Sequence, residues 1–167
     1  MAKILKNTFV KIPCDLLGME EVFAFLATVE KLCHHLVVCV GGGSQISQAL
    51  REEGIESAFG SLGREITDDR GRAIALKILN GNVGRFNAGL AEREIRATVL
   101  TPVLEIGGVL CGVLCLVNGD IYTLSAYHGF SRLFVLTTAD RLEEKKQQFA
   151  RFGACLVPQG KIEIVGF

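Results

Sequence analysis

Apolar and polar positions along the chain fall into short apolar runs separated by longer stretches with a helical period. Each short run is rich in β-branched or aromatic residues and is bounded by polar residues, glycine or proline, which is typical of buried strands. This pattern predicts strands at Thr8–Ile12, Leu36–Val40, Ala97–Val103, Val109–Val117 and Arg132–Thr137, and two short final strands at Ala154–Leu156 and Ile162–Val165. Gly107-Gly108 would form the turn of a hairpin.

In the stretches between these runs, apolar residues recur every three or four positions, which favours helices with one buried face. Gly54 suits the left-handed residue past a helix end, and Asp68 or Asp69 suits an N-cap. Ile55–Thr67 has no clear period and reads as an extended loop or a β-hairpin. The predicted helices are Met19–Cys33, Gln45–Glu53, one through Ile74–Leu90 with a break at Gly81, Ile121–His128 closed by Gly129, and one from Asp140, with Glu143 three residues on, to about Phe152.

Strands that alternate with helices predict an α/β fold, a three-layer α/β/α sandwich around a mostly parallel open sheet. At 167 residues, 49% of them apolar, the chain suits one domain over 1–167. In such sheets ligands bind at the carboxyl ends of the strands.

Charge and cysteine usage narrow the class of partner. Lysine plus arginine and aspartate plus glutamate number 18 each, which argues against nucleic acid or a membrane surface and favours a small neutral or anionic ligand. The six cysteines include no Cys-x-x-Cys pair and we see no leader peptide, so we expect reduced thiols and a cytoplasmic protein. The histidines lack companion ligands, and no metal site is expected.

The run Leu36–Val40 leads directly into Gly41, Gly42, Gly43 and Ser44 and then a helical pattern. Glycines let the backbone approach a ligand, and the first turn of a helix offers free N–H groups, so this loop suits a phosphate or carboxylate. A tight turn that binds nothing is the alternative. A Rossmann dinucleotide site fits less well, because its third glycine or alanine position is occupied by Ile46.

Val10-Lys11, Val38–Ser44, Gly54–Ser57, Thr67-Asp68 and Asn118-Gly119-Asp120 together resemble the amino acid kinase family, with acetylglutamate kinases the nearest match, over about Thr8 to Thr138. The resemblance implies transfer of the terminal phosphoryl group of ATP to a carboxylate or phosphate of a small metabolite, with Mg²⁺ as electrostatic partner.

The resemblance also implies a role for each candidate residue. Lys11 would stabilise the moving phosphoryl group, and Asp120 would organise the lysines and the metal. Lys11, Gly41 and Gly42 would hold the cofactor, and the substrate would be bound by Gly41, Gly42, Gly43, Ser44, Arg64 and Asn118. The structural alternatives are a lysine that reaches water, an N-cap at Asp120 and an exposed arginine.

Two departures from the amino acid kinase pattern favour an alternative function. The chain would then be a catalytically inactive member that binds a metabolite or serves in an assembly. Ile12-Pro13-Cys14 stands where the family has x-Gly-Gly, and much of the family's nucleotide-binding C-terminal half is missing. Lys145 and Lys146 could replace a lysine of that half, but their charged helix face predicts that they are solvated. The helix over Ile74–Leu90 suggests the contact face of a homodimer or larger oligomer.

Overall fold

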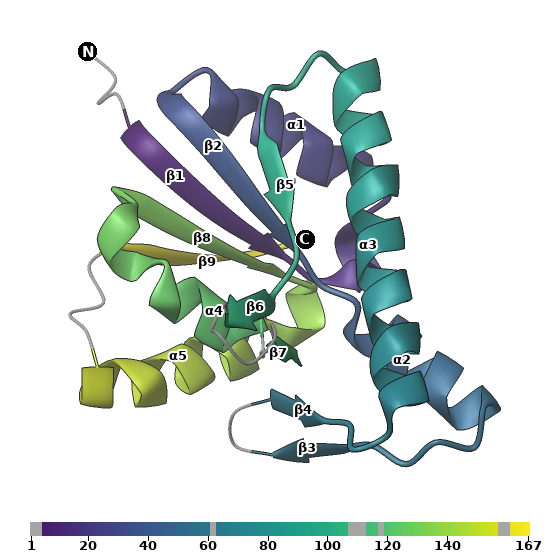
Figure 1. The fold of residues 1–167 in the computed structure, drawn as a ribbon. Helices are drawn as coiled ribbons and strands as arrows, with labels where there is room; N and C mark the ends of the chain where they lie inside the picture. The colour runs from purple at the N-terminus through teal and green to yellow at the C-terminus, as the bar shows by residue number, and fades with distance from the viewer. Residues whose placement is uncertain (1–4, 61–62, 107–112, 117–118, 157–160) are drawn as a thin grey trace.

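The computed structural model describes residues 5–60, 63–106, 113–116, 119–156 and 161–167. Among these residues the main sheet has five parallel strands in the order β5-β2-β1-β8-β9 (Figure 1). In that order the strands are Thr98–Leu100, Cys33–Val40, Leu5–Ile12, Arg132–Thr137 and Ile162–Gly166. The chain first builds outward on one side of β1 and later on the other, so the strand order reverses beside β1, where ligands of open α/β sheets bind.

Helices cover both faces of this sheet. The helices α1 (Glu20–Glu30) and α3 (Asp69–Glu92) lie on one face, and α4 (Gly119–Ser125) and α5 (Leu142–Leu156) lie on the other (Figure 1). Alternation along the strands explains the two cores: Val10 packs toward α1 and α3, whereas Phe9 packs with residues of and after α4. The expected α/β class and mostly parallel open sheet are confirmed.

Helix α2 (Gly43–Glu52) and two hairpins lie near the carboxyl edge of the sheet (Figure 1). Helix α2 follows β2 and packs on α3 through Ile46 and Leu50. Two antiparallel hairpins are formed by β3 (Ala58–Gly60) with β4 (Gly63–Glu65), and by β6 (Val103–Ile106) with β7 (Val113–Leu116). Short 3₁₀ turns are η1 (Cys14–Leu16), η2 (Tyr127–Gly129) and η3 (Ala139–Arg141).

Most predicted elements are confirmed, along with two of their end signals. Gly54 has a φ of 66° just past α2, the left-handed conformation expected there. Asp68 is the N-cap of α3 and its carboxylate accepts a hydrogen bond from the Gly71 N–H at 2.9 Å. The hairpin alternative for Ile55–Thr67 is the correct one, because β3 and β4 lie within it.

Several boundaries were wrong. Helix α3 continues through Gly81, since one glycine costs only about 1 kcal/mol in a helix whose neighbours Leu79 and Asn82 are buried. The segment Ala154–Leu156 ends α5 instead of forming a strand. Three apolar residues are too few for their periodicity to distinguish a strand from the end of a helix. The strand expected at Ala97–Val103 divides between β5 and β6. Asp140 lies in η3, before α5 begins, and the Gly107-Gly108 turn lies outside the described residues.

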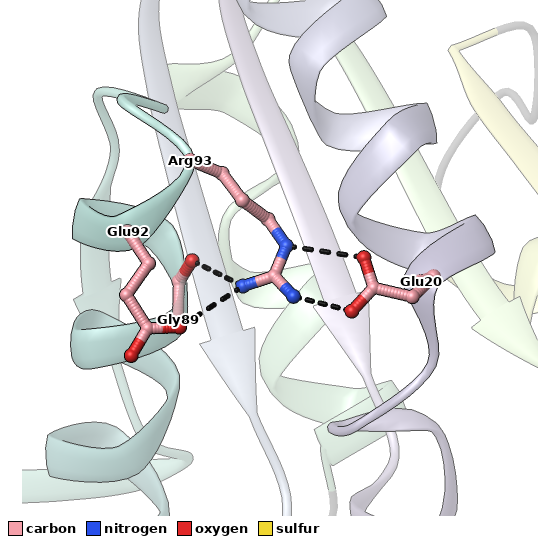
Figure 2. Close-up of polar contacts among 4 residues, drawn as sticks. All are labelled: Glu20, Gly89, Glu92 and Arg93. Carbon is pink, nitrogen blue, oxygen red and sulfur yellow. Dashed lines mark hydrogen bonds and ion pairs between the residues drawn. The ribbon is translucent and has the colours of Figure 1, made fainter.

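Arg93, just past α3, ties that helix to the start of α1 (Figure 2). Its guanidinium donates to both Glu20 carboxylate oxygens and to the Gly89 carbonyl oxygen (2.9 Å). The same group lies 4.2 Å from the centroid of the Phe23 ring. Because the Glu20 side chain is exposed, the ion pair adds little to the free energy of folding. It orients α1 and α3 over the buried rings of Phe23 and Phe86.

The apolar side of α3 is used within the chain. Phe86 and Leu90 pack against the sheet and α1, and Ala75 and Leu79 pack against α2. These four side chains therefore serve the chain's own core, while a subunit contact through the helix over Ile74–Leu90 and homo-oligomerisation itself stay predictions. Among the described residues, no helix has the length and apolar character needed to cross a membrane.

Phe86 tests the packing between α3 and α1. Its ring is 1% exposed and stacks on Phe23, with centroids 5.1 Å apart. We expect Phe86→Ala to lower the free energy of unfolding by about 3–5 kcal/mol, measured by urea denaturation, because it opens a cavity in the core. Phe59→Ala is the matched control, since Phe59 is 65% exposed and should change stability by under about 0.5 kcal/mol. Equal effects of the two variants would contradict the described core.

Candidate functional site

Three charged side chains from distant parts of the chain meet at the carboxyl edge of the sheet. Asp120, in the first turn of α4, lies between Lys11 of β1 and Lys145 of α5. Its Oδ1 is 3.3 Å from Lys11 Nζ and its Oδ2 is 2.6 Å from Lys145 Nζ. All three residues are buried, with 8%, 3% and 7% of Lys11, Asp120 and Lys145 exposed. We call these three residues the lysine–aspartate cluster.

Local structure explains how Lys11 reaches this cluster. Val10 and Ile12 belong to the core under α1 and α3, so alternation along β1 directs Lys11 to the opposite face, where α4 lies. Gly119 precedes Asp120, and a Cβ at that position would lie 3.1 Å from Lys11 Cε. The absence of a side chain at Gly119 therefore gives the Lys11 stem its path to the carboxylate.

The cluster sets the protonation state of its carboxylate. Burial raises the pKa of Asp120, but the positive charges of Lys11 and Lys145 and their hydrogen bonds outweigh it, so the pKa lies below the ordinary value. Beside the cluster, burial raises the pKa of the Cys39 thiol to about 12, with Lys11 opposing the shift. Cys39 is thus a protonated core thiol, and Cys14, Cys33 and Cys39 are all free, as expected of reduced cysteines.

A pocket of about 450 Å³ opens in front of the two lysines. Its walls come from the exit of β1, the glycine loop, the β3–β4 hairpin and the segments around α4 and α5. The lining residues are Lys11, Pro13, Cys14, Asp15, Gly41, Gly42, Gly43, Ser44, Ile46, Ser47, Phe59, Arg64, Leu79, Pro102, Gly119, Arg141 and Lys145. The structure thus brings Lys11, the three glycines, Ser44 and Arg64 to one pocket, with Asp120 directly behind its lysines.

The glycine loop joins β2 to α2, as the sequence predicts, but its amides are not equivalent. The Gly41 N–H donates to the Ile12 carbonyl oxygen at 2.9 Å, which extends the β1–β2 pairing by one bond. This corrects the expectation that the Gly41 amide serves a ligand. Gly42 is the N-cap of α2 and Gly43 its first residue, and N–H groups of a first helical turn have no partner within the helix. The amides of the first turn, those of Gly42 and Gly43 among them, are therefore the donors that this end of α2 has available for an anion.

Arg64 lines the pocket, but its guanidinium already donates hydrogen bonds to three groups of the protein itself. It donates to Ser57 Oγ (2.9 Å), to the Gly43 carbonyl oxygen (2.9 Å) and to Ser47 Oγ (2.6 Å). The guanidinium carbon also lies 4.2 Å from the centroid of the Phe59 ring. Arg64 is half-buried, so the exposed-arginine reading is wrong. These bonds hold the β3–β4 hairpin against the first turn of α2.

The exit of β1 carries side chains where the amino acid kinase pattern has glycines. Pro13 has no N–H to donate, and Cys14 and Asp15 follow it in η1. Ser44 Oγ donates to Asp15 Oδ1 at 2.7 Å and lies 3.1 Å from Cys14 Sγ. A carboxylate of the chain itself thus lines the pocket beside the first turn of α2.

Lys145 is the residue that sequence reasoning placed wrongly. It is buried against Asp120 and also donates to Gln148 Oε1 (2.8 Å), whereas its neighbour Lys146 is exposed and pairs with Glu143. The signal was present: Lys145 lies four positions before the buried Phe149, so the two share the inward face of α5. Asn118, the remaining predicted site residue, lies outside the described residues.

Comparison with known proteins gives a partial sequence match and similar folds. No family model matches the chain. A stretch of 67 residues is 40% identical to an acetylglutamate kinase of Koribacter versatilis (strain Ellin345), covering 40% of the chain and 24% of that protein. The chain therefore spans well under two thirds of this relative.

The fold is also similar to that of N-acetylglutamate synthase from Neisseria gonorrhoeae. Its complex with coenzyme A and N-acetyl-glutamate superposes with a TM-score of 0.64 at 14% identity, over 81% of this chain and 42% of that one. Its complex with coenzyme A and L-arginine gives a TM-score of 0.52 at 15% identity, over 81% and 44%. At this identity the likeness establishes the fold, and any shared activity is a matter for proposal.

Asp120→Asn tests the electrostatics of the cluster. Removing the carboxylate leaves two buried ammonium groups without their counter-charge, so we expect the free energy of unfolding at pH 7 to fall by about 3–5 kcal/mol. Because the folded pKa of Asp120 is lowered, its contribution is present above about pH 4, the unfolded value, and is lost as pH falls through the folded pKa.

Urea denaturation at several pH values measures both effects. The difference between wild type and Asp120→Asn should be largest near neutrality and narrow in acid. Asp69→Asn removes a carboxylate that is 94% exposed and should be near neutral throughout. A difference that does not change with pH would contradict the assigned charge state.

Proposed function

We propose that this chain carries a phosphoryl-transfer site that moves the terminal phosphoryl group of ATP onto a carboxylate or phosphate of a small metabolite. One observation carries the proposal: two ammonium groups held by a single buried carboxylate face the same pocket as the glycine loop. Phosphoryl transfer asks for this combination, because catalysis consists almost entirely of positioning and of stabilising negative charge on the moving group.

In this reaction the bond between the terminal phosphorus and the bridging oxygen of ATP breaks, and an acceptor oxygen forms the new bond to phosphorus. ADP leaves, and a carboxylate acceptor becomes an acyl phosphate. Lys11 and Lys145 would stabilise charge on the transferring group, and the amides of Gly42 and Gly43 would hold phosphate oxygens. Asp120 would hold both lysines in place through its two oxygens.

The exit of β1 fits a bare nucleotide phosphate less well than the lysine side does. Pro13 offers no N–H, and Asp15 would repel a phosphate brought near α2. Mg²⁺ is usually held by one or two carboxylates together with substrate phosphates, and Asp15 is a carboxylate of this pocket that would serve in that role. When bound, the ion would neutralise phosphate charge; Asp15 would then be a ligand instead of a repulsive group.

A second candidate function, binding of a small anionic metabolite without turnover, is favoured by the Ser44–Asp15 hydrogen bond. This 2.7 Å contact joins η1 to α2 and occupies the Ser44 hydroxyl. If the bond persists with ligand present, the lysines and the glycine amides would still bind a carboxylate or phosphate. The nucleotide phosphates would then receive no hydrogen bond from the Ser44 hydroxyl.

Ligand binding and turnover separate the two functions. Thermal unfolding with Mg²⁺-ATP, ADP, N-acetylglutamate, glutamate, aspartate and carbamate should show stabilisation by about 2.7 kcal/mol for a ligand at 100 times its dissociation constant. ADP release with each acid, and hydroxylamine trapping of an acyl phosphate, report transfer. No shift with any nucleotide would refute the kinase function and leave the binding function.

Lys145→Met tests the residue that the structure adds to the cluster. We expect the rate of phosphoryl transfer to fall by about 10²–10³-fold, because one preorganised positive charge is removed from the transferring group. Lys146→Met is the matched control: it lies next to Lys145 on the same helix but is exposed and contacts Glu143, so its rate should match wild type. Equal rates in all three proteins would remove Lys145 from the site.

Asp15→Asn tests the carboxylate at the β1 exit. Without Mg²⁺ we expect the dissociation constant of inorganic phosphate to fall by about three- to tenfold, since a repulsive charge is removed beside the first turn of α2. The same variant should need more Mg²⁺ for half-maximal transfer if the carboxylate is a metal ligand. Isothermal titration measures the first effect, and Asp69→Asn controls for net charge. An unchanged phosphate affinity would show that Asp15 does not oppose the anion.

A further inference from the structure

A fully buried amide of α3 contacts the glycine loop from behind. Asn82 is 0% exposed, and its Nδ2 donates to the Gly41 carbonyl oxygen at 2.8 Å and to Gln45 Oε1 at 2.7 Å. On its other side, Asn82 Oδ1 accepts a hydrogen bond from Arg85. Helix α3 runs alongside α2 (Figure 1). This arrangement brings Asn82 into contact with Gly41, although the two residues are forty-one positions apart in the sequence.

The chemistry of its partners fixes which way the Asn82 amide faces. A guanidinium has donors and no acceptor, so the group facing Arg85 must be the Asn82 oxygen. The nitrogen therefore faces Gly41, whose carbonyl can only accept. The assignment agrees on both sides, and the amide has no satisfactory flipped alternative.

This contact fixes the plane of the peptide between Gly41 and Gly42. Across a trans peptide, the carbonyl of one residue and the N–H of the next point in opposite directions. With the Gly41 carbonyl held by Asn82, the Gly42 N–H is directed away from α3. Gly41 is held at its other end as well, because its own N–H donates to Ile12.

A glycine pair needs such a restraint more than other residues do. Two successive glycines lack the Cβ atoms that limit backbone rotation, so their shared peptide can turn over at low cost. Gly42 itself is backed by α3: a Cβ there would lie 3.1 Å from Leu79 Cδ2. The loop is thus packed against α3, but packing alone does not choose the orientation of the peptide, whereas a hydrogen bond to its carbonyl does.

We propose that Asn82 is a positioning residue for the glycine loop, because it holds the Gly41–Gly42 peptide with the Gly42 N–H facing the pocket. In this way Asn82 sets the affinity of the loop for a phosphate or carboxylate. The inference rests on the anion-binding part of the proposed function and does not require turnover. Gln45 and Arg85 support it by completing the hydrogen bonds of the buried amide. A donor arranged before the ligand arrives avoids the cost of ordering it on binding.

The test is a titration of the ¹⁵N-labelled full chain with inorganic phosphate, followed by amide chemical shifts. In wild type, the Gly42 and Gly43 amides should shift saturably. In Asn82→Ala the Gly41 carbonyl loses its donor, and in Asn82→Asp a carboxylate faces it. We expect the dissociation constant to rise by about tenfold or more in both, with the shift at Gly42 lost.

Two further variants make the test specific. Asn80→Asp makes the same charge change at an exposed position on the same helix and should bind phosphate as wild type does. Gln45→Ala leaves Asn82 in place but removes one of its acceptors, and should weaken binding by about two- to fivefold. It serves as the readout if the Asn82 variants do not fold.

The outcomes separate this inference from the proposed function. Loss of the Gly42 shift in the Asn82 variants, or weakened binding in Gln45→Ala, with Asn80→Asp unchanged, supports the positioning role whether or not ATP is turned over. Phosphate binding unchanged in every folded Asn82 or Gln45 variant overturns the positioning role and leaves phosphoryl transfer open. No phosphate response at Gly42 or Gly43 in wild type also overturns it, while ADP release remains the separate measure of transfer.

Discussion

The site depends on one carboxylate that compensates two buried ammonium groups. An isolated lysine is costly to bury, and a pair of lysines side by side is costlier, so Lys11 and Lys145 can lie inside the fold only because Asp120 stands between them. The cluster still holds one more positive than negative charge. Both ammonium groups line the pocket, so this excess positive charge is the basis of the proposed anion binding.

The parallel topology decides what can surround this charge. Since β2 and β8 flank β1, the carboxyl ends of all three strands share one edge, and the segments that follow them meet there. Lys11 comes from β1, the glycine loop follows β2, and α5 with Lys145 follows β8. Helix α3 then reaches the loop from the opposite layer through Asn82, so the site has support from both faces of the sheet.

How far the sequence could predict this arrangement depends on whether a feature is local. The exit of β2 into three glycines, the N-cap at Asp68 and the left-handed Gly54 are encoded by neighbouring residues, and all were predictable. The spacing of Lys145 to Phe149 indicated the inward face of α5, but the carboxylate that makes a buried lysine tolerable comes from α4, twenty-five positions earlier, and that contact was not predictable from local sequence. Asn82 was missed for the same reason: its partner Gly41 lies forty-one positions away, and a lone asparagine in a helix carries no signal of that contact. The role of a charged or polar side chain in a helix can therefore be predicted only when the residue that it contacts in the fold is known.

The charged residues of the pocket make different demands on a ligand. Lys11, Lys145 and Arg141 line it as cations, whereas Asp15 lines it as a carboxylate that accepts a hydrogen bond from Ser44 in the first turn of α2. A simple anion satisfies the lysines but meets repulsion from Asp15. A ligand that also carries a cation or a hydrogen-bond donor satisfies both kinds of group. Metal-bound phosphate meets this requirement, and so does an acid with a protonated amine. Under the proposed function, the charges of this pocket suit a ligand that carries both signs, because a ligand of one sign would leave either the lysines or Asp15 poorly matched.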